Sequence, residues 1–273
     1  LDGLAALHMW EEPCISGEHG SGAVFFSGCT LRCIFCQNSE IAAAQVGKKI
    51  TVDRLCDIFL ELQDKCANNI NLVTATHFVP QVADSLIKAK NKGLVIPVVY
   101  NSSSYENVST VKMLDGLVDV YLPDMKYIDS RLSSEYSNAP DYADVAKAAI
   151  HEMVRQTGKP EFFTEDDELV KSGRVEAGIM KKGVIVRHLV LPGTTKDSKA
   201  VIKYLIDTYG DDIYISIMSQ YTPFERLKNH QRLSRKVTRK EYDSVVDYAI
   251  DCGINNGFIQ EGDVAEESFI LTP

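Results

Sequence analysis

Short runs of β-branched and other apolar residues alternate with amphipathic helices along most of this chain, and no other feature constrains its fold as much. Such alternation is typical of βα units arranged around a parallel sheet. The predicted strands cover residues 23–26, 70–75, 94–100, 118–122, 184–191 and 213–218. These units predict an α/β fold built as a partial (β/α)6 barrel.

The predicted helices follow the strands. They cover residues 52–66, 79–92, 142–156 and 196–209, and a further helix ends near residue 117. In the first of them, Leu55, Phe59 and Leu62 recur at spacings of four and three, so one apolar stripe faces a core. Residues 161–182 break the alternation and predict an inserted loop or hairpin.

The sequence predicts one structural domain with short extensions at both ends. Its core covers residues 23–223, preceded by an N-terminal extension of residues 1–22 and followed by a C-terminal extension of residues 224–273. The C-terminal extension begins with a basic stretch, Arg226 to Lys240, and ends in an acidic tail. The sequence contains neither an internal repeat nor a linker long enough to separate domains.

Composition argues against several classes of protein. Lys and Arg total 29 against 38 for Asp and Glu, and the net charge of −9 argues against general nucleic-acid binding. Apolar runs are too short to span a membrane, and the N-terminus lacks the pattern of a signal peptide. The 7 cysteines are too few for a disulfide scaffold, and three of them are clustered. We therefore expect a reducing, cytoplasmic compartment in which clustered thiolates bind metal.

The clustered cysteines are Cys29, Cys33 and Cys36. Their spacing allows three thiolates to surround one corner of a compact iron–sulfur core. Because no fourth cysteine follows, a cubane [4Fe–4S] cluster would keep one iron without a protein ligand. An open position of this kind is typical of a metal site that binds a substrate or cofactor. The alternative is structural zinc, with His19 or His77 as the fourth ligand.

The motif C-x3-C-x2-C, with the aromatic Phe35 before its last cysteine, resembles the signature of the radical SAM superfamily. Residues 24–29 and 31–33, together with Asn38, resemble the corresponding loop of glycyl-radical-enzyme activases. Segments 10–13, 76–81, 121–124 and 187–193 are similar to a branch named after pyruvate formate-lyase activating enzyme. The similarity extends from about Trp10 to Gln260, nearly the whole chain.

This resemblance implies the cofactors and the chemistry. Cys29, Cys33 and Cys36 would hold a [4Fe–4S] cluster, and the amino and carboxylate groups of S-adenosylmethionine (SAM) would chelate its open iron. The reduced cluster would pass one electron to the sulfonium, and the resulting 5′-deoxyadenosyl radical would abstract a hydrogen atom. The protein must orient SAM and exclude water. Phe35 would lie near the adenine and present its backbone to it, or else lie in the core.

The resemblance also implies which residues bind SAM. Many relatives carry Gly-Gly-Glu after the second strand, whereas this chain has Thr74-Ala75-Thr76-His77. Threonine hydroxyls or backbone carbonyls would then bind the methionyl amine. Asp124 and Lys126 lie two residues apart, so in an extended segment their side chains project to the same face and suit a zwitterionic ligand. The alternative for this pair is a salt bridge at the rim.

Arg187 and His188 are neighbours in a predicted strand, so they cannot both face the barrel interior. We expect Arg187 to bind the SAM carboxylate, because its planar guanidinium suits bidentate contact. Further candidates for contact with SAM are Asn38, Thr74, Thr76, Asn101, Ser103 and Gln220, and the candidates for catalysis are His77, His188 and Cys14.

Three functions stay open at this point. The first is abstraction of hydrogen from a backbone glycine of a protein partner, although Gly20-Ser21-Gly22-Ala23 stands where activases usually carry Gly-x-Gly-x-Arg. The second is radical modification of another peptide or of a small metabolite. The third is a non-catalytic iron–sulfur or zinc protein. In the first two, flavodoxin or ferredoxin would donate the electron, and the basic stretch could dock such an acidic donor.

Overall fold

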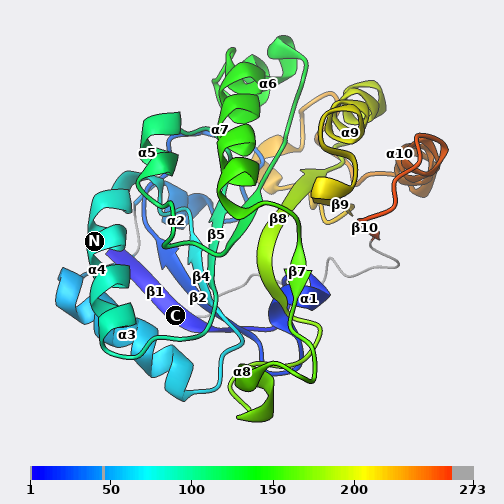
Figure 1. The fold of residues 1–273 in the computed structure, drawn as a ribbon. Helices are drawn as coiled ribbons and strands as arrows, with labels where there is room; N and C mark the ends of the chain where they lie inside the picture. Colours follow the sequence, from blue (N-terminus) through cyan, green and yellow to red (C-terminus); the bar gives the residue numbers. More distant parts are fainter. Residues whose placement is uncertain (1, 45–46, 260–273) are drawn as a thin grey trace.

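A mostly parallel sheet with helices against one face forms the α/β architecture of the computed structural model, which describes residues 2–44 and 47–259 (Figure 1). The sequence-predicted strands are, in spatial order, β2 (Ser21–Phe26), β4 (Ile70–Val73), β5 (Val98–Ser102), β6 (Val120–Pro123), β8 (Met180–Leu189) and β9 (Tyr214–Met218). They run parallel, and β10 (Gly257–Ile259) extends the series beside β9. The predicted α/β fold is therefore confirmed. The sheet is mostly parallel and is not fully closed, because its end strands, β10 and β3 (Lys48–Lys49), do not pair with each other among the described residues.

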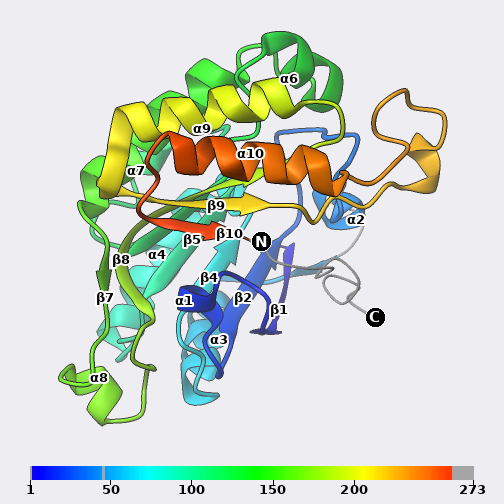
Figure 2. The ribbon, with the colours of Figure 1, turned by 90° about the vertical axis from the view of Figure 1, so that its right-hand side faces the viewer.

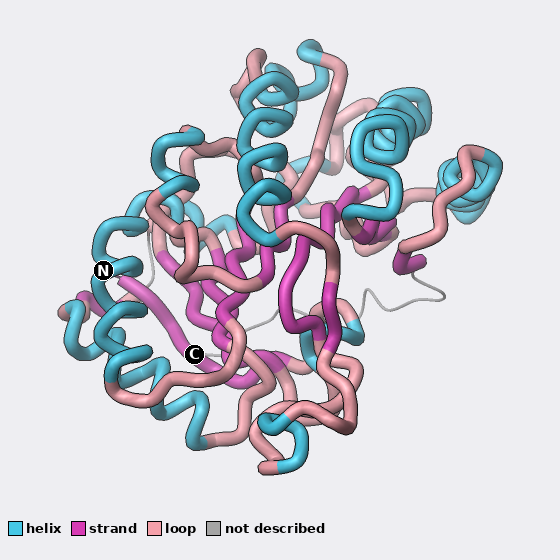
Figure 3. Tube along the Cα trace, in the orientation of Figure 1, coloured by secondary structure: helices cyan, strands magenta, loops and turns pink. Residues whose placement is uncertain are grey.

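The longer helices follow the parallel strands, as the alternation predicts (Figure 3). They are α3 (Val52–Asp64), α4 (Val79–Asn91), α7 (Tyr142–Thr157) and α9 (Thr195–Tyr209), with α10 (Arg239–Asp251) packed beside α9. The short helix α5 (Val108–Lys112) follows β5. Shorter helical segments are α1 (Pro13–Ser16), α2 (Ser39–Ala42), α6 (Ser130–Ser137), α8 (Glu168–Lys171), and the 3-10 turns η1 (Thr76–Phe78), η2 (Gly210–Asp212) and η3 (Glu225–Leu227). No helix in the described part of the chain is long and apolar enough to cross a membrane.

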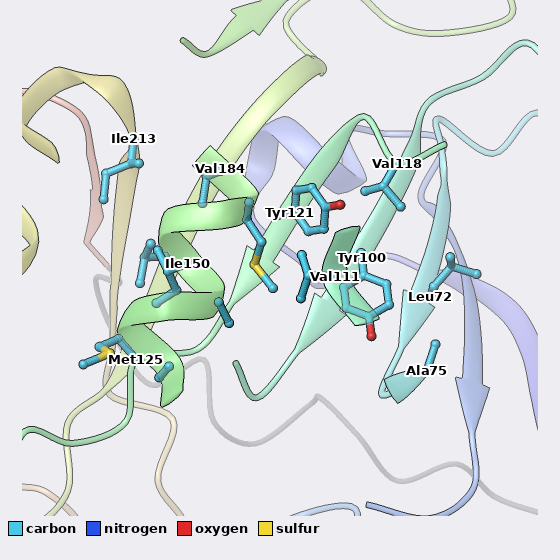
Figure 4. Packing of buried hydrophobic residues seen from close by; sticks show 14 of the residues in the cluster. Leu72, Ala75, Tyr100, Val111, Val118, Tyr121, Met125, Ile150, Val184 and Ile213 are labelled. Carbon is cyan, nitrogen blue, oxygen red and sulfur yellow. The ribbon is translucent and has the colours of Figure 1, made fainter. Parts of the chain in front are cut away.

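The main hydrophobic core lies between the sheet and these helices (Figure 4). Leu72, Tyr100 and Tyr121, from three neighbouring strands, are fully buried there. Because successive side chains of a strand point to opposite faces, the residues next to them in the sequence face the other way. That opposite face has a smaller core of its own, to which Val99 and Val120 contribute.

A segment at the N-terminus closes the opposite face at the amino ends of the strands. Figure 2 shows α1 on the side of the sheet away from α9 and α10. Ile15 in α1 is fully buried against the smaller core, and its carbonyl accepts a hydrogen bond from Asn69 Nδ2 (2.7 Å) just before β4. We call residues 11–16 the N-terminal plug, because most of them are buried on this face of the sheet.

Several elements differ from the prediction. The N-terminal extension contains an unpredicted strand, β1 (Asp2–His8), which pairs antiparallel with β2, and α6 is also additional. Strand β5 begins at Val98 rather than at residue 94, after Pro97, which has no backbone N–H to donate to a neighbouring strand. Residues 161–182 form the predicted hairpin, in which β7 (Glu161–Phe162) pairs antiparallel with β8. The predicted acidic tail lies outside the described residues.

Candidate functional site

A cavity of about 230 Å³ lies at the carboxyl ends of the parallel strands. Phe26, Asn101 and Leu189 line it from the ends of β2, β5 and β8. Thr74 and Asp124 line it from the positions directly after β4 and β6. Ligand sites of parallel α/β proteins lie at this edge of the sheet. The cavity is therefore at the position that the fold class favours for a ligand.

The loop after β2 contributes Cys29, Cys33 and Cys36 to the lining of this cavity. All three side chains are partly exposed. Gly28 has a φ of 89° and makes the turn that leads from β2 into the loop. On its far side the loop is attached to α6, because Cys33 Sγ lies 3.0 Å from Ser137 Oγ. We call residues 28–38 the cysteine loop.

The donor set of the cysteine loop fits an iron–sulfur cluster. Burial raises the pKa of Cys29 to about 11 and also raises the pKa of Cys36, so binding of metal by the thiolates would release protons. No group of three His, Cys, Asp or Glu side chains in the described ranges is arranged around a single metal ion. In a cubane cluster, however, each thiolate binds a different iron. Three thiols on one cavity therefore suit a [4Fe–4S] cluster with one open iron.

The two histidines considered as zinc ligands are not part of the described cavity lining. His19 Nδ1 lies 3.3 Å from the Glu176 carboxylate, and its side chain is largely exposed. His77 lies against Gly28, at the start of the cysteine loop. In the described ranges, neither histidine belongs to a group of three side chains that could hold one metal ion, as a tetrahedral zinc site requires.

Arg187 lies at the centre of a group of charged and polar side chains in the cavity. Its Nη1 donates to Glu11 Oε2 (3.2 Å), and its Nη2 donates to Asn101 Oδ1 (2.6 Å). Its Nε donates to Asp124 Oδ1 (3.1 Å), while Lys126 Nζ donates to Asp124 Oδ2 (2.7 Å). The four charged side chains are only 7% to 18% exposed. We call these five residues the Arg187 network.

The two carboxyl groups of the network have different pKa shifts. Burial by itself would raise the pKa of Asp124, but Lys126 and Arg187 outweigh burial and hold that pKa below its ordinary value. For Glu11, burial outweighs the opposing effect of Arg187, and the pKa is raised. The network therefore presents an ionised Asp124 between two cations, with a more easily protonated carboxyl group at Glu11.

Tyr142 of α7 holds the backbone of this part of the site. Its hydroxyl accepts a hydrogen bond from the Lys126 backbone N–H (3.0 Å). The same hydroxyl lies 2.8 Å from the carbonyl oxygen of Asp124 and 2.9 Å from that of Ser103, and it donates to one of them. One tyrosine thus connects the chain segments that follow β5 and β6, and its ring is fully buried.

Most of the residues that the sequence suggests for cofactor or metal binding lie together. The cavity is lined by Cys29, Cys33, Phe35, Cys36, Asn38, Thr74, Asn101, Ser103, Asp124, Lys126, Arg187 and Gln220. The structure also decides between the neighbours Arg187 and His188 in β8. Arg187 faces the cavity, and His188 points to the opposite face of the strand.

Four of the residues that the sequence suggests for the site do not belong to the described cavity lining. His188 is buried, its Nδ1 lies 2.8 Å from the Met125 carbonyl oxygen, and burial lowers its pKa to about 4. Cys14 is buried in the N-terminal plug. Thr76 donates its hydroxyl hydrogen to Glu106 Oε1 (3.0 Å), and His77 lies beside the cysteine loop. Of the three residues suggested for catalysis, Cys14 and His188 are buried away from the described cavity lining, and His77 is exposed beside the cysteine loop.

The cavity also contains residues that the sequence analysis does not suggest as site residues. Glu11 is the most important of them, because it comes from the N-terminal plug and contacts Arg187 across the chain. A pair of acidic residues before the proline of a buried helix, Glu11-Glu12-Pro13, is the signal that could have indicated it. Gln37 and Ser102 also line the cavity.

Thr74 has an unusual backbone conformation at the cavity edge. Its φ of 61° lies in the left-handed region, which favours glycine and is rare for a β-branched residue. The chain therefore keeps a turn suited to glycine while placing a hydroxyl group at the cavity.

Comparison with known proteins gives similarity in sequence and in fold. No protein-family model matches the chain. It is 26% identical over 250 residues to the uncharacterized protein MJ0674 of Methanocaldococcus jannaschii, a match that covers 89% of this chain. The matched part is 65% of that relative, so the chain spans somewhat less than two-thirds of its length.

Solved structures of low sequence identity share the fold. SuiB of Streptococcus suis, solved with bound S-adenosylmethionine, has a TM-score of 0.56 and 14% identity, over 92% of this chain and 55% of SuiB. Methylornithine synthase (PylB) has a TM-score of 0.55 and 11% identity, over 83% of this chain and 60% of PylB. HydG, a maturase of the [FeFe]-hydrogenase, has a TM-score of 0.52 and 13% identity, over 85% of this chain and 48% of HydG. The chain therefore has the same α/β fold as these three proteins.

Proposed function

We propose that this chain is a radical SAM enzyme, which uses a [4Fe–4S] cluster and SAM to abstract a hydrogen atom from an organic substrate. One observation carries the proposal. The three cysteines of the C-x3-C-x2-C motif and the Arg187 network line a single cavity at the carboxyl ends of a parallel α/β sheet. The shared fold with SuiB, which has been solved with SAM, supports the same cofactor here.

The chain's own residues divide the work of binding. Cys29, Cys33 and Cys36 would hold the cluster, and when bound it would supply the electron that cleaves SAM to methionine and a 5′-deoxyadenosyl radical. For the SAM carboxylate we propose Lys126 in place of Arg187, which the sequence suggested, because Asp124 takes only one of the three hydrogens on Lys126 Nζ. Asp124 is ionised and can also accept a hydrogen bond from the methionyl amine.

Arg187 acts mainly as a fixed positive charge in this arrangement. Its contacts with Glu11, Asn101 and Asp124 use most of its five N–H groups. The guanidinium is therefore held in place before a ligand arrives, which lowers the cost of ordering it. Asn38 and Gln220 line the same cavity and would reach the ribose or the adenine of SAM.

Apolar side chains surround the charged network. Phe25, Leu31, Ile41, Leu189 and Met218 line the cavity together with the polar residues described above. Their surfaces exclude water, which strengthens the electrostatic contacts to a bound ligand and protects a reactive radical from side reactions. The lining is thus suited to chemistry that requires a dry site.

The first substrate that we propose to test is a backbone glycine of a protein partner. The support for it is the likeness of residues 24–33 to the loop of glycyl-radical-enzyme activases. Another peptide or a small metabolite is the alternative substrate. As electron donor we propose flavodoxin or ferredoxin, whose acidic surface would dock on the exposed basic side chains between Arg226 and Lys240.

The class of chemistry is tested by anaerobic reconstitution with iron and sulfide, followed by reduction in the presence of SAM. We expect about four irons per chain, as in a cubane cluster, and reductive release of 5′-deoxyadenosine. Cys33→Ala should lose both, whereas Cys252→Ala should retain both, because Cys252 is not part of the described cavity lining. One zinc per chain, or no cleavage of SAM by the fully loaded protein, would overturn the proposal.

The substrate is tested by label transfer. Candidate peptides, proteins and metabolites are supplied in deuterated form to the reduced, loaded protein with SAM. Deuterium should appear in 5′-deoxyadenosine with the true hydrogen donor and with no other candidate. Transfer from a small metabolite, and none from glycine-deuterated proteins, would contradict the proposed activase role.

A further inference from the structure

The cysteine loop is attached to the C-terminal extension by one arginine. Arg226 Nε donates to the Ile34 carbonyl oxygen (3.0 Å), and its Nη2 donates to the Cys36 carbonyl oxygen (3.1 Å). A third contact runs from Nη1 to Ser39 Oγ (3.3 Å). The planar guanidinium thus donates to three acceptors in the segment that contains the last cysteine of the motif.

Arg226 is itself held in a defined position. It belongs to η3, in which the next residue, Leu227, is buried. Its guanidinium lies over the ring of Phe224, at 4.5 Å from the ring centroid. Gln37 Nε2 donates to the Gln220 carbonyl oxygen (2.9 Å), which provides a second link between the cysteine loop and this part of the chain. A side chain so supported can keep the loop in one conformation.

The charge of Arg226 has a separate effect. A cubane cluster held by three thiolates becomes more negative when it gains an electron, so a cation beside it stabilises the reduced state. Lys126 provides one such cation from inside the cavity, and Arg226 provides a second from the surface side of the loop. We propose that Arg226 positions the cysteine loop and, if the proposed function holds, raises the reduction potential of the cluster.

Two substitutions separate these effects. Arg226→Gln removes both the charge and the three-way contact, whereas Arg226→Lys keeps the charge but cannot reproduce the planar fork. Arg235→Gln is the matched control, because Arg235 lies in the same basic stretch but contacts Glu241 and the Lys236 carbonyl rather than the cysteine loop. All three variants are made in the full chain.

Positioning is measured first, on the iron-free chain. The Ile34 amide donates to the Tyr136 carbonyl of α6, and the Cys36 amide donates to the Cys33 carbonyl within the loop. The hydrogen exchange of these two amides therefore reports how often the loop opens or leaves α6. Each lost hydrogen bond is worth roughly 1 kcal/mol, or about fivefold in the opening equilibrium. We expect at least fivefold faster exchange in Arg226→Gln and Arg226→Lys, and unchanged exchange in Arg235→Gln. Equal exchange in all four proteins would overturn the positioning role.

The potential is measured second, on the reconstituted chain, by redox titration of the cluster signal in electron paramagnetic resonance. We expect a more negative midpoint in Arg226→Gln, a midpoint near wild type in Arg226→Lys, and no change in Arg235→Gln. Equal midpoints for Arg226→Gln and wild type would overturn the electrostatic role. If the wild-type chain assembles no cluster, the proposed function and the electrostatic role fail together, while the exchange experiment still decides the positioning role.

Discussion

Replacing Arg187 by methionine tests the Arg187 network most directly. Methionine has a similar length but no charge, so Arg187→Met leaves Glu11 and Asp124 buried with Lys126 as the remaining cation. Removing one partner of a buried ion pair typically costs about 3–5 kcal/mol, because the other partner keeps its desolvation penalty. We expect a loss of that size in the free energy of unfolding at pH 8.

The loss should depend on pH. Burial raises the pKa of Glu11 and Arg187 opposes that rise, so the variant should hold a proton on Glu11 at a higher pH than the wild type. A carboxyl group whose pKa is higher in the folded state than in the unfolded state loses its contribution to stability as the pH rises through the folded-state pKa. The deficit of Arg187→Met should therefore be smaller at pH 5.5 than at pH 8.

The measurement is urea unfolding of the iron-free chain at both pH values, followed by far-UV circular dichroism. Adding Glu11→Gln to Arg187→Met should recover about 1–3 kcal/mol relative to the sum of the single changes, because the two side chains are in contact. Arg131→Met is the control, because its ion pair with Asp129 is at the surface and such pairs contribute about 1 kcal/mol or less. A deficit below about 1 kcal/mol at pH 8, or one that is equal at both pH values, would refute the reasoning.

Three further predictions follow from the site and the fold. Asp124→Asn should weaken SAM binding by roughly 10-fold to 100-fold, as expected when a charged hydrogen bond is lost, with iron content unchanged; equilibrium dialysis against labelled SAM measures this. His188→Gln should make the free energy of unfolding less sensitive to acid. Burial lowers the pKa of His188 to about 4, so the wild type should lose about 1 kcal/mol of that free energy for each pH unit as the pH falls from about 6 to 4, and urea midpoints across that range measure the difference. Ile15→Ala should lower the free energy of unfolding by about 2–5 kcal/mol, because it opens a cavity under the N-terminal plug; a loss below 1 kcal/mol would show that the plug does not contribute to the core.

Local sequence patterns predicted the parallel strands and the helices that follow them. The parallel strands follow β-branched runs, and the helices follow apolar stripes such as that of Leu55, Phe59 and Leu62. Strand β1 was not evident because Asp2–His8 is rich in Ala and Leu, which favour helices, and its pairing with β2 provides the stability instead. Helix α6 is polar and short, and its ends depend on Asp129 at the N-cap and Asn138 in a left-handed conformation.

In the candidate site, too, the sequence predicted the contacts between residues that are close in the chain and missed those between distant residues. Asp124 and Lys126 could be paired from the sequence because two residues along a strand end project to one face. Glu11 and Arg226 could not, because their contacts join positions 176 and 190 residues apart, and no local pattern indicates such a distance. For Arg187 and His188, the strand alternation required one to face inward, but only the packed structure decides which.

The position of the N-terminal plug affects how the lining of the cavity could be changed. Glu11 reaches Arg187 from the N-terminal plug, which belongs to none of the parallel strands and forms no strand pairing with them. The residue at position 11 can therefore vary while every strand pairing is preserved. The side chain at position 11 would then set the acidity of the cavity beside a bound ligand. Engineering of new ligand selectivity could begin at that position, with the parallel strands unchanged.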